Sequence, residues 1–399
     1  MKTLLLLGGS RYTLPIIKAA HEMGHRVITC DYLPDNIGHK FSDEYCNVSI
    51  IEKDAVLETA KRLKIDGVMS FACDPGVVTA AYVADKLGLP NVGPYESVCI
   101  LQNKERFRKF LADNGFIVPT AKGFTSADEA VKNADMFHWP VIVKPTDSAG
   151  SKGVTRVDKT DDLKSAAEHA LKFSHCGQFI VEDFIEKQGF SSDTDCFSVN
   201  GELNFVSFNN QRFDEKAENP YTPAAFSWPS SMSEAHQKEL TSEIQRLIKL
   251  LNMGTSVYNV ETREGVDGKA YIMEVSPRGG GNRLSECLKY ATGVDLITNA
   301  VRGALGEKVI GVEQRDYNGC WAEVVLHSDT PGVFSGLWTS DTLAKAIVER
   351  DLWVNEGDRI GGFSAANEAV GTLILRFGSQ KELQNVMDNL PDHVRVVVK

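Results

Sequence analysis

Two short apolar segments near residue 265 each carry one glutamate, and this pair limits what the chain can fold into. The segments 256–263 and 269–275 have the composition of strands, and a Val-Asp-Gly turn at 266–268 joins them. Antiparallel pairing across this turn places Glu261 opposite Glu274. Opposed carboxylates among apolar neighbours repel each other, and an unpaired charge there is costly. We therefore expect something positive between them.

A metal ion or an arginine could serve as that positive partner. Magnesium is held in proteins by one or two carboxylates together with phosphate oxygens of a substrate. Arg263 and Arg278 are close in sequence, so an ion pair with either is the alternative. The stretch 271–286 (YIMEVSPRGGGNRLSE) continues with three glycines, which suit close approach of backbone to a ligand. We predict a Mg²⁺ (or Mn²⁺) site at Glu261 and Glu274.

A second motif, 139–153 (WPVIVKPTDSAGSKG), combines an apolar strand with a loop of small residues. The strand ends at Lys144, Pro145 turns the chain, and the loop follows. Backbone amides of such a loop can approach phosphate oxygens while lysines neutralise the charge. It is not a Walker A loop, because GK[ST] is absent, and a plain hairpin turn is the alternative. We predict phosphate binding by Lys144 and by the loop residues Ser148, Ala149, Gly150, Ser151, Lys152 and Gly153.

Lys104 supports the same interpretation from another segment. It lies in the first turn of a helix predicted over 103–114, which ends before Gly115. A cation at this end of a helix opposes the helix dipole. The position therefore indicates an anionic partner for Lys104, and a solvated lysine is the alternative.

Residues 1–95 alternate apolar strands with helices, which is typical of an open parallel sheet. The predicted strands are 3–7, 26–31 and 67–71, and the predicted helices are 14–23, 55–63 and 77–87. Gly8, Gly9 and Asp31 are similar to parts of a dinucleotide site. However, Tyr12 and Thr13 stand where the GxGxxG pattern needs glycine, which disfavours NAD binding.

We predict a multidomain α/β and α+β fold in three parts. Residues 1–95 form the parallel α/β domain, 96–310 a two-part domain and 311–399 a small mixed C-terminal domain. The middle domain divides into two segments. Residues 96–185 contain the loop 148–153, called the lysine loop below, and residues 186–310 contain the paired glutamates.

Within these parts, turn chemistry and periodicity predict further elements. A hairpin turns at Asn200-Gly201, a polar segment with three prolines at 209–233 forms a loop, and a helix covers 234–251. The C-terminal domain contains strands at 320–326, 371–377 and 394–398 and helices at 342–349 and 380–390, with His327 in a structural role.

Composition limits the possible partners. The 399 residues carry a formal net charge of −11, which argues against nucleic acid as the main partner. Eight cysteines occur singly without a CxxC pair, as expected for reduced thiols in a cytoplasmic protein. No segment approaches the roughly 18 apolar residues of a membrane span. We expect a cytoplasmic protein with small-molecule substrates, no membrane partner and a possible homodimer.

Together, the lysine loop, the paired glutamates and the run EVSPR resemble the ATP-grasp superfamily of carboxylate–amine ligases over essentially the full length. The sequence is most similar to the purine-biosynthetic and biotin-carboxylase-like branch, whose formate-dependent glycinamide ribonucleotide transformylase has a run like EVSPR. It is also similar to the amino-acid ligases that make dipeptides. The resemblance implies an N-terminal α/β domain, a two-part ATP-grasp domain and a small C-terminal domain.

The resemblance also implies residue roles. Lys104, Lys144 and the loop 148–153 would contact ATP phosphates, and the adenine would lie against Glu182, Asp183, Phe184 and Ile185. Glu261 and Glu274 would bind Mg²⁺, helped weakly by Ser276, where many relatives have asparagine. The acid that binds ribose in relatives is replaced by Gly189 or Phe190, and Glu186 or Asp193 could substitute. Arg278 would act with Lys144 in catalysis, and the substrate would meet Arg278, Gly280, Asn282 and Arg283.

The reaction implied is ATP-dependent amide formation through an acyl phosphate, with release of ADP and phosphate and with Mg²⁺ as metal cofactor. A biotin-carboxylase-like or formate- or bicarbonate-activating enzyme is one alternative. A nicotinamide oxidoreductase and a non-catalytic nucleotide-binding protein are alternatives from other classes.

Overall fold

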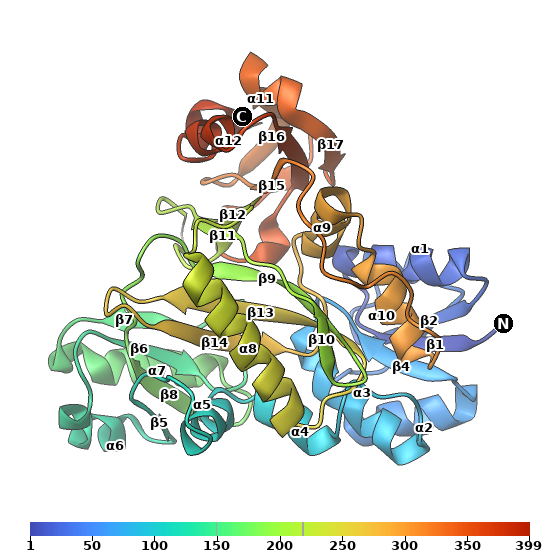
Figure 1. The fold of residues 1–399 in the computed structure, drawn as a ribbon, viewed down its shortest axis with the longest axis horizontal. Helices are drawn as coiled ribbons and strands as arrows, with labels where there is room; N and C mark the ends of the chain where they lie inside the picture. Colours follow the sequence, from blue (N-terminus) through green and yellow to red (C-terminus); the bar gives the residue numbers. More distant parts are fainter. Residues whose placement is uncertain (149, 218) are drawn as a thin grey trace.

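The N-terminal part is a four-stranded parallel sheet covered by helices (Figure 1). A computed structural model describes residues 1–148, 150–217 and 219–399. The strands β1 (Thr3–Leu7), β2 (Arg26–Asp31), β3 (Glu44–Asn47) and β4 (Gly67–Ser70) lie in the order β3-β2-β1-β4. The helices are α1 (Leu14–Glu22), α2 (Lys53–Leu63) and α3 (Asp74–Leu87). Because Leu4, Leu5, Leu6 and Leu7 are all fully buried, β1 is the centre of this sheet, as its unbroken apolar run predicts.

The lysine loop belongs to a small antiparallel sheet. After α4 (Tyr95–Leu101) and α5 (Lys104–Asp113), the strands β5 (Ala121–Phe124), β6 (Val141–Pro145), β7 (Thr155–Val157) and β8 (Phe179–Asp183) pair in the order β5-β8-β6-β7. Helices α6 (Ala127–Lys132) and α7 (Leu163–Phe173) pack on this sheet through a shared apolar core. The loop connects β6 to β7, so the sheet holds both of its ends.

The two glutamates lie on a second antiparallel sheet, of order β10-β9-β13-β14. Its strands are β9 (Ser192–Val199), β10 (Glu202–Phe205), β13 (Ser256–Glu264) and β14 (Ala270–Ser276), and helix α8 (Glu234–Leu250) packs against it. Asn200 and Gly201 have φ of 51° and 81°, so the predicted tight turn between β9 and β10 is confirmed. The expected α8 is also confirmed.

Glu261 pairs directly with Glu274, as predicted, but by an unexpected route. At the hairpin tip the register is Glu264 with Ala270, and Thr262 pairs with Ile272. Met273 is therefore an extra residue, a bulge that shifts the register by one and brings the two acids opposite each other.

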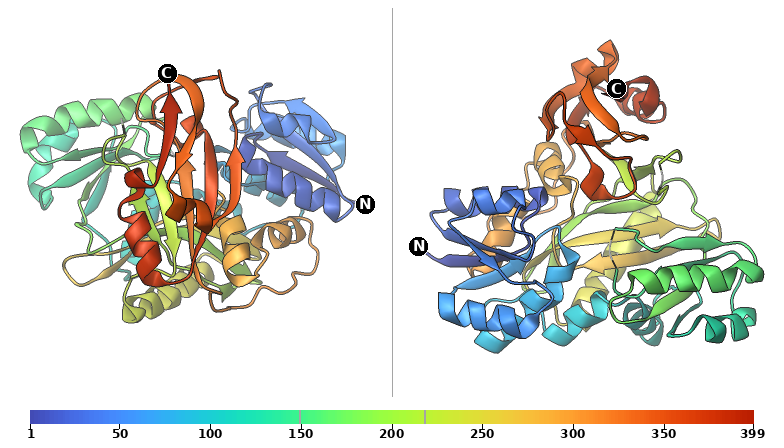
Figure 2. Two further views of the ribbon diagram at one scale, coloured as in Figure 1. Left: turned by 90° about the horizontal axis from the view of Figure 1, so that it is seen from above. Right: turned by 180° about the vertical axis from the view of Figure 1, so that it is seen from behind.

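Helices α9 (Leu284–Thr292) and α10 (Leu296–Ala304) lead to the C-terminal part. There, β11 (Asn210–Phe213), β12 (Pro223–Trp228), β15 (Cys320–Leu326), β17 (Ile347–Leu352) and β19 (Gly371–Phe377) form one sheet in the order β11-β12-β15-β19-β17. A second sheet pairs β16 (Gly332–Thr339) with β18 (Arg359–Ile360) and β20 (Val394–Val398). Helices α11 (Asp341–Ala346) and α12 (Gln380–Met387) complete this part, which rises above the other two in Figure 1 and is seen from two further sides in Figure 2.

The loop predicted over 209–233 was wrong in part, because it contains β11 and β12. Pro223 opens β12, a position where strands tolerate proline, and 224–228 is a fully buried run. The helix predicted over 342–349 was too long, since α11 ends at Ala346 and β17 begins at the next residue.

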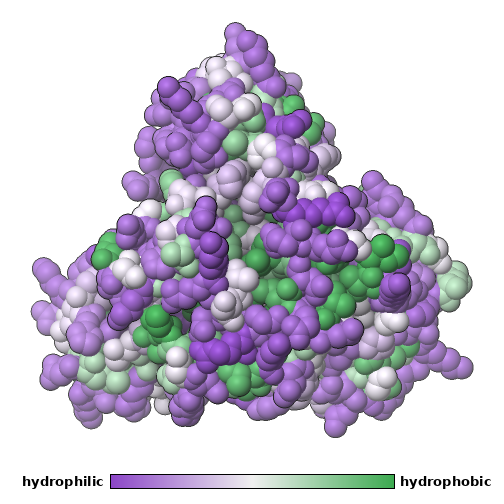
Figure 3. All heavy atoms as spheres, in the orientation of Figure 1, coloured by the Kyte–Doolittle hydropathy of each residue, from purple (hydrophilic) through white to green (hydrophobic). Residues whose placement is uncertain are grey.

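The surface is mostly hydrophilic on the face drawn in Figure 3, with hydrophobic residues gathered over the side where α10 lies. Among the described helices, none has the length and apolar character that crossing a membrane requires.

Candidate active site

Three carboxylates form one row across neighbouring strands. Glu261 on β13 pairs with Glu274 on β14 and, on its other side, with Asp193 on β9. Two residues away along each strand, Asn259 pairs with Ser276 and with Asp195. Residues two apart in a strand face the same side of a sheet, so both rows face the same side. Asn259 Nδ2 links them, donating to Asp193 Oδ1 at 2.8 Å and to Asp195 Oδ1 at 3.4 Å.

The row is electrostatically unfavourable unless it holds a cation. Burial, and then the charge of Glu261, raise the pKa of Asp193 to about 7. The nearest cations are distant for ion pairs: Lys104 Nζ is 3.7 Å from Glu274 Oε2, and Arg263 Nη2 is 3.5 Å from Glu261 Oε1. Charge-assisted hydrogen bonds are usually below 3 Å. The alternative of an ion pair with Arg263 is therefore supported only by a long contact. The three carboxylates of Glu261, Glu274 and Asp193 fit a divalent cation such as Mg²⁺.

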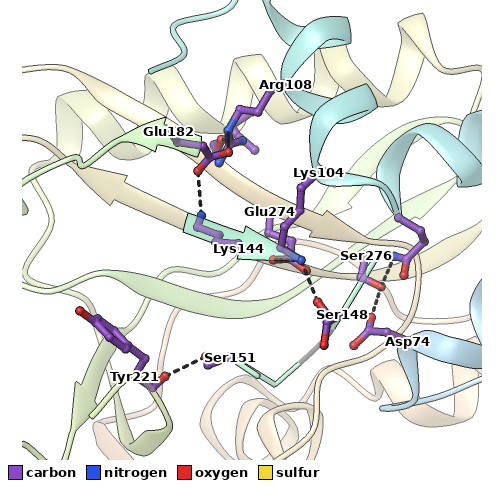
Figure 4. Close-up of polar contacts among 12 residues, drawn as sticks. Asp74, Lys104, Arg108, Lys144, Ser148, Ser151, Glu182, Tyr221, Glu274 and Ser276 are labelled. Carbon is purple, nitrogen blue, oxygen red and sulfur yellow. Dashed lines mark hydrogen bonds and ion pairs between the residues drawn. The ribbon is translucent and has the colours of Figure 1, made fainter. Parts of the chain in front are cut away.

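Lys104 connects the acids to the lysine loop (Figure 4). It is the first residue of α5, whose N-terminus is capped by the Asn103 side chain, which accepts from Arg106 N at 3.0 Å. Lys104 Nζ donates to the carbonyl oxygen of Ser148 at 3.0 Å, on the side where Glu274 lies. The predicted position of Lys104 in the first turn is confirmed, and the structure places it between the loop and the acids.

The lysine loop also contacts a distant segment. Ser151 Oγ donates to Tyr221 O at 3.1 Å (Figure 4). Gly150 and Gly153 have φ of 68° and 71°, values that glycine adopts without strain, and Lys152 is exposed. Ala149, also predicted to bind phosphate, lies outside the described residues.

Lys144 is bonded to a buried acid. Its Nζ donates to Glu182 Oε2 at 2.8 Å, and Arg108 Nε donates to Glu182 Oε1, also at 2.8 Å. Burial alone would raise the pKa of Glu182, but Arg108 and Lys144 hold it down to about 2. The Glu182 side chain thus points toward Lys144 (Figure 4), so any contact of Glu182 with adenine falls to its backbone. Sequence reasoning missed Arg108.

The other residues expected at the adenine lie at the end of β8. Asp183 accepts hydrogen bonds from His138 N and Nδ1, at 2.8 and 2.9 Å. Phe184 stacks under the guanidinium of Arg156, 4.5 Å from the ring centroid. The carbonyl of Ile185 accepts from Arg263 Nη1 at 3.1 Å, which joins this segment to the strand that carries Glu261. Their contact with a nucleotide stays a prediction.

Arg278 is held by an acid of the N-terminal part. Its Nε and Nη2 donate to the two oxygens of Asp74 at 2.9 and 2.7 Å. Ser276 Oγ donates to Asp74 Oδ1 and accepts from Gln102 Nε2, both at 2.8 Å, so this predicted weak metal ligand is bonded on both sides (Figure 4). Sequence reasoning missed Asp74, which is the first residue of α3, four positions after the end of β4.

The remaining substrate candidates line or border one cavity. Gly280 N donates to Asp195 Oδ1 at 2.8 Å, and Asn282 Oδ1 accepts from Tyr12 OH at 3.0 Å. Arg283 is paired with Glu286 and Glu349, at 3.0 and 2.8 Å. A cavity of about 100 Å³ lies among residues of the N-terminal part, the glycine run and the C-terminal part, including Arg11, Tyr12, Phe71, Gly280, Glu286 and Trp353.

Parts of this chain are similar in sequence to known proteins. Residues 137–286 match a family described as "ATP-grasp domain", a range that includes the lysine loop and both glutamates. The carbamoyl phosphate synthase large chain of Ralstonia nicotianae is 25% identical over 297 residues, which are 73% of this chain and 27% of that one. A formate-dependent phosphoribosylglycinamide formyltransferase from Synechococcus is 28% identical over 187 residues, 46% of this chain and 47% of that one. The chain thus spans less than half the length of these relatives.

Solved structures share the fold over the whole chain. An L-amino acid ligase from Bacillus licheniformis superposes with a TM-score of 0.80 at 20% identity, covering 100% of this chain and 99% of that one. A phosphoribosylglycinamide synthetase from Anaerococcus prevotii gives a TM-score of 0.76 at 22% identity and covers 100% of both chains. The expected multidomain architecture is therefore confirmed.

Proposed function

From the match of residues 137–286 to the ATP-grasp domain family, we propose that this chain joins a carboxylate to an amine using ATP, through an acyl phosphate. The observation that carries the proposal is the placement of Lys104. This one cation lies between the loop carbonyl of Ser148 and the carboxylate of Glu274, which itself faces Glu261. A site with a loop of backbone donors, lysines and opposed acids suits the triphosphate of a nucleotide and its metal.

ATP would lie between the two antiparallel sheets of the middle domain. Lys104, Lys144 and the loop residues would contact its phosphates, and residues 182–185 its base. Mg²⁺ would be held by Glu261 and Glu274, where it neutralises charge on the phosphates during transfer. Asp193 adds a third acid beside Glu261, and with Glu186 it is one of the two candidates for the ribose contact that Gly189 and Phe190 lack.

The first chemical step transfers the γ-phosphoryl group. An oxygen of the substrate carboxylate attacks the γ-phosphorus of ATP, and the bond from this phosphorus to the β-phosphate oxygen breaks. ADP is the leaving group, and the acyl phosphate remains in the site. Lys144 and Lys104 stabilise the charge on the transferred group. The hydrogen bond from Ser151 to Tyr221 holds the loop against the segment before β12, which would keep water from the acyl phosphate.

The second step forms the amide. The amine nitrogen attacks the acyl carbon, loses a proton, and phosphate leaves with both electrons of the C–O bond. Arg278 is suited to bind the carboxylate and then the tetrahedral oxyanion. Among the described residues, Asp74 and the carbonyl of Gly279 accept from three of its five N–H groups, which leaves two for a ligand. Asp74 thus positions Arg278.

A screen of ADP release tests this proposal. Purified protein with ATP and Mg²⁺ would be assayed against pairs of carboxylates and amines, with amino acids in both sets because an L-amino acid ligase shares the fold. One pair is expected to stimulate ADP release with an equal amount of amide, shown by mass spectrometry. Stimulation by bicarbonate or formate without an amine product would favour the carboxylase-like alternative. ATP binding without ADP release across the panel would contradict catalysis.

A further inference from the structure

The C-terminal part contains a group of metal-ligating side chains away from the acid row. Asp214 follows β11, His327 follows β15 and Asp329 lies two residues further on. One potential ligand atom from each lies within 4.8 Å of the others. His327 Nε2 is 3.1 Å from Asp214 Oδ2, although the two residues are 113 positions apart in sequence. The fold therefore brings a histidine and two acids together from separate segments.

The imidazole of His327 is oriented by contacts outside this group. Its Nδ1 is 2.8 Å from the carbonyl oxygen of Val325, and a carbonyl only accepts, so Nδ1 carries a proton. One ring face stacks on Phe363, with centroids 4.0 Å apart and planes at 17°. Nε2 is consequently directed at the two acids. A histidine whose second nitrogen is bonded to a backbone carbonyl is the usual arrangement of a metal ligand.

The two carboxylates of the group lie close to each other, and a cation between them would offset their repulsion. A divalent ion on Nε2 and both carboxylates would balance the charges and would leave the exposed Asp329 side open to water.

We propose that Asp214, His327 and Asp329 bind a divalent transition-metal ion of the Zn²⁺ class. The imidazole ligand selects such ions over Mg²⁺ and Ca²⁺, which prefer oxygen ligands alone. This site is separate from Glu261 and Glu274, and the proposal does not rest on the proposed function.

The ion would also stabilise the contact between the lysine loop and Tyr221. Asp214 begins the segment that continues to Tyr221, whose carbonyl accepts the hydrogen bond from Ser151. Further along, Thr222 Oγ1 donates to Ser364 O, and Ala217 is buried against Phe363. A metal bond to Asp214 would fix one end of the segment whose other end, Tyr221, contacts the lysine loop. Ion binding is therefore expected to slow hydrogen exchange of the backbone amides around residues 150–153 and 219–222.

Titration calorimetry on full-length protein, stripped of metal with EDTA and free of nucleotide, tests the site. Zn²⁺ is the probe, and Co²⁺ absorbance reports nitrogen ligation. Wild type is expected to bind one Zn²⁺. Asp329→Asn should weaken that affinity about 10-fold or more, and His327→Ala should abolish it. Glu274→Gln, at the other proposed metal site, and Glu356→Gln, an exposed acid of the same domain, should bind Zn²⁺ like wild type.

The proposal is overturned if wild type binds no Zn²⁺ without nucleotide, or if Asp329→Asn binds it unchanged. Asp329 is exposed, so that variant decides the question even if His327→Ala fails to fold. Hydrogen exchange measured with and without Zn²⁺ then tests the coupling. Slower exchange at 150–153 and 219–222 in wild type, absent in Asp329→Asn, supports it, and unchanged exchange in wild type contradicts it.

Discussion

The guanidinium of Arg278 and the carboxylate of Asp74 form a two-bond ion pair that ties the segment after β14 to the N-terminal domain. The two bonds measure 2.9 and 2.7 Å and join residues 204 positions apart. Arg278 ends the run EVSPR, and Asp74 is the first residue of α3. The residue proposed to meet the acyl phosphate is thus aimed by the N-terminal domain, whose Asp74 also accepts a hydrogen bond from Ser276 Oγ.

Removing the charge of Asp74 should therefore impair catalysis through Arg278. Asp74→Asn loses the bidentate partner, and a displaced guanidinium should lower kcat by about 100-fold with a smaller change in the KM for ATP. Steady-state ADP release with the substrate pair from the screen measures both. Asp74→Glu, which keeps the charge, should recover part of the loss. Equal loss in both variants would indicate a packing effect rather than positioning of Arg278.

Glu274→Gln should abolish Mg²⁺-dependent turnover while the protein stays folded. Glu274 is partly exposed, and its removal relieves repulsion with Glu261, so thermal stability without nucleotide should be equal to or above that of wild type. Turnover and thermal unfolding, each measured with and without Mg²⁺-ATP, check both expectations. Normal turnover in this variant would refute the metal assignment.

The buried pair of Glu182 with Arg108 and Lys144 should make stability depend on pH. The pKa of Glu182 falls from 4.5 to about 2 on folding, so its ionised form stabilises the native state. That stabilisation is fully present above about pH 4.5 and is lost as pH falls toward 2. Denaturant unfolding of Glu182→Gln and wild type should differ by about 3 kcal/mol at pH 7 and by much less at pH 3. A difference that does not change with pH would contradict this assignment.

Ser151→Ala should uncouple ATP use from product formation. The variant loses the hydrogen bond to Tyr221 O, so the loop should open more often and admit water to the acyl phosphate. More ADP than amide is then expected, whereas wild type should give equal amounts. Ser242→Ala, which changes an exposed helical serine bonded only to its own helix, is the matched control. Equal ADP and amide from Ser151→Ala would argue against a role of this contact in excluding water.

Local patterns predicted much of the fold. Three predictions depended only on neighbours in sequence, and each was confirmed: the buried strand β1, the turn at Asn200-Gly201 and the helix α8, which was predicted from the spacing of its apolar residues. The two strands within 209–233 were missed, because a polar segment with three prolines indicates a loop when burial is unknown. The early end of α11 at Ala346 was missed for a different reason, because no glycine or proline separates it from β17.

The sequence alone placed Glu261 and Glu274 on the two strands of one hairpin, because a hairpin is a local structure, and the bulge at Met273 brings the two acids directly opposite each other. It also determined the lysine loop and the place of Lys104 at a helix start. Only the tertiary structure decided that Asp193 completes the acid row, that Asp74 holds Arg278 and that Arg108 shares Glu182 with Lys144. These partners come from distant segments, and their contacts depend on how sheets and domains pack, which no local periodicity or turn signal encodes.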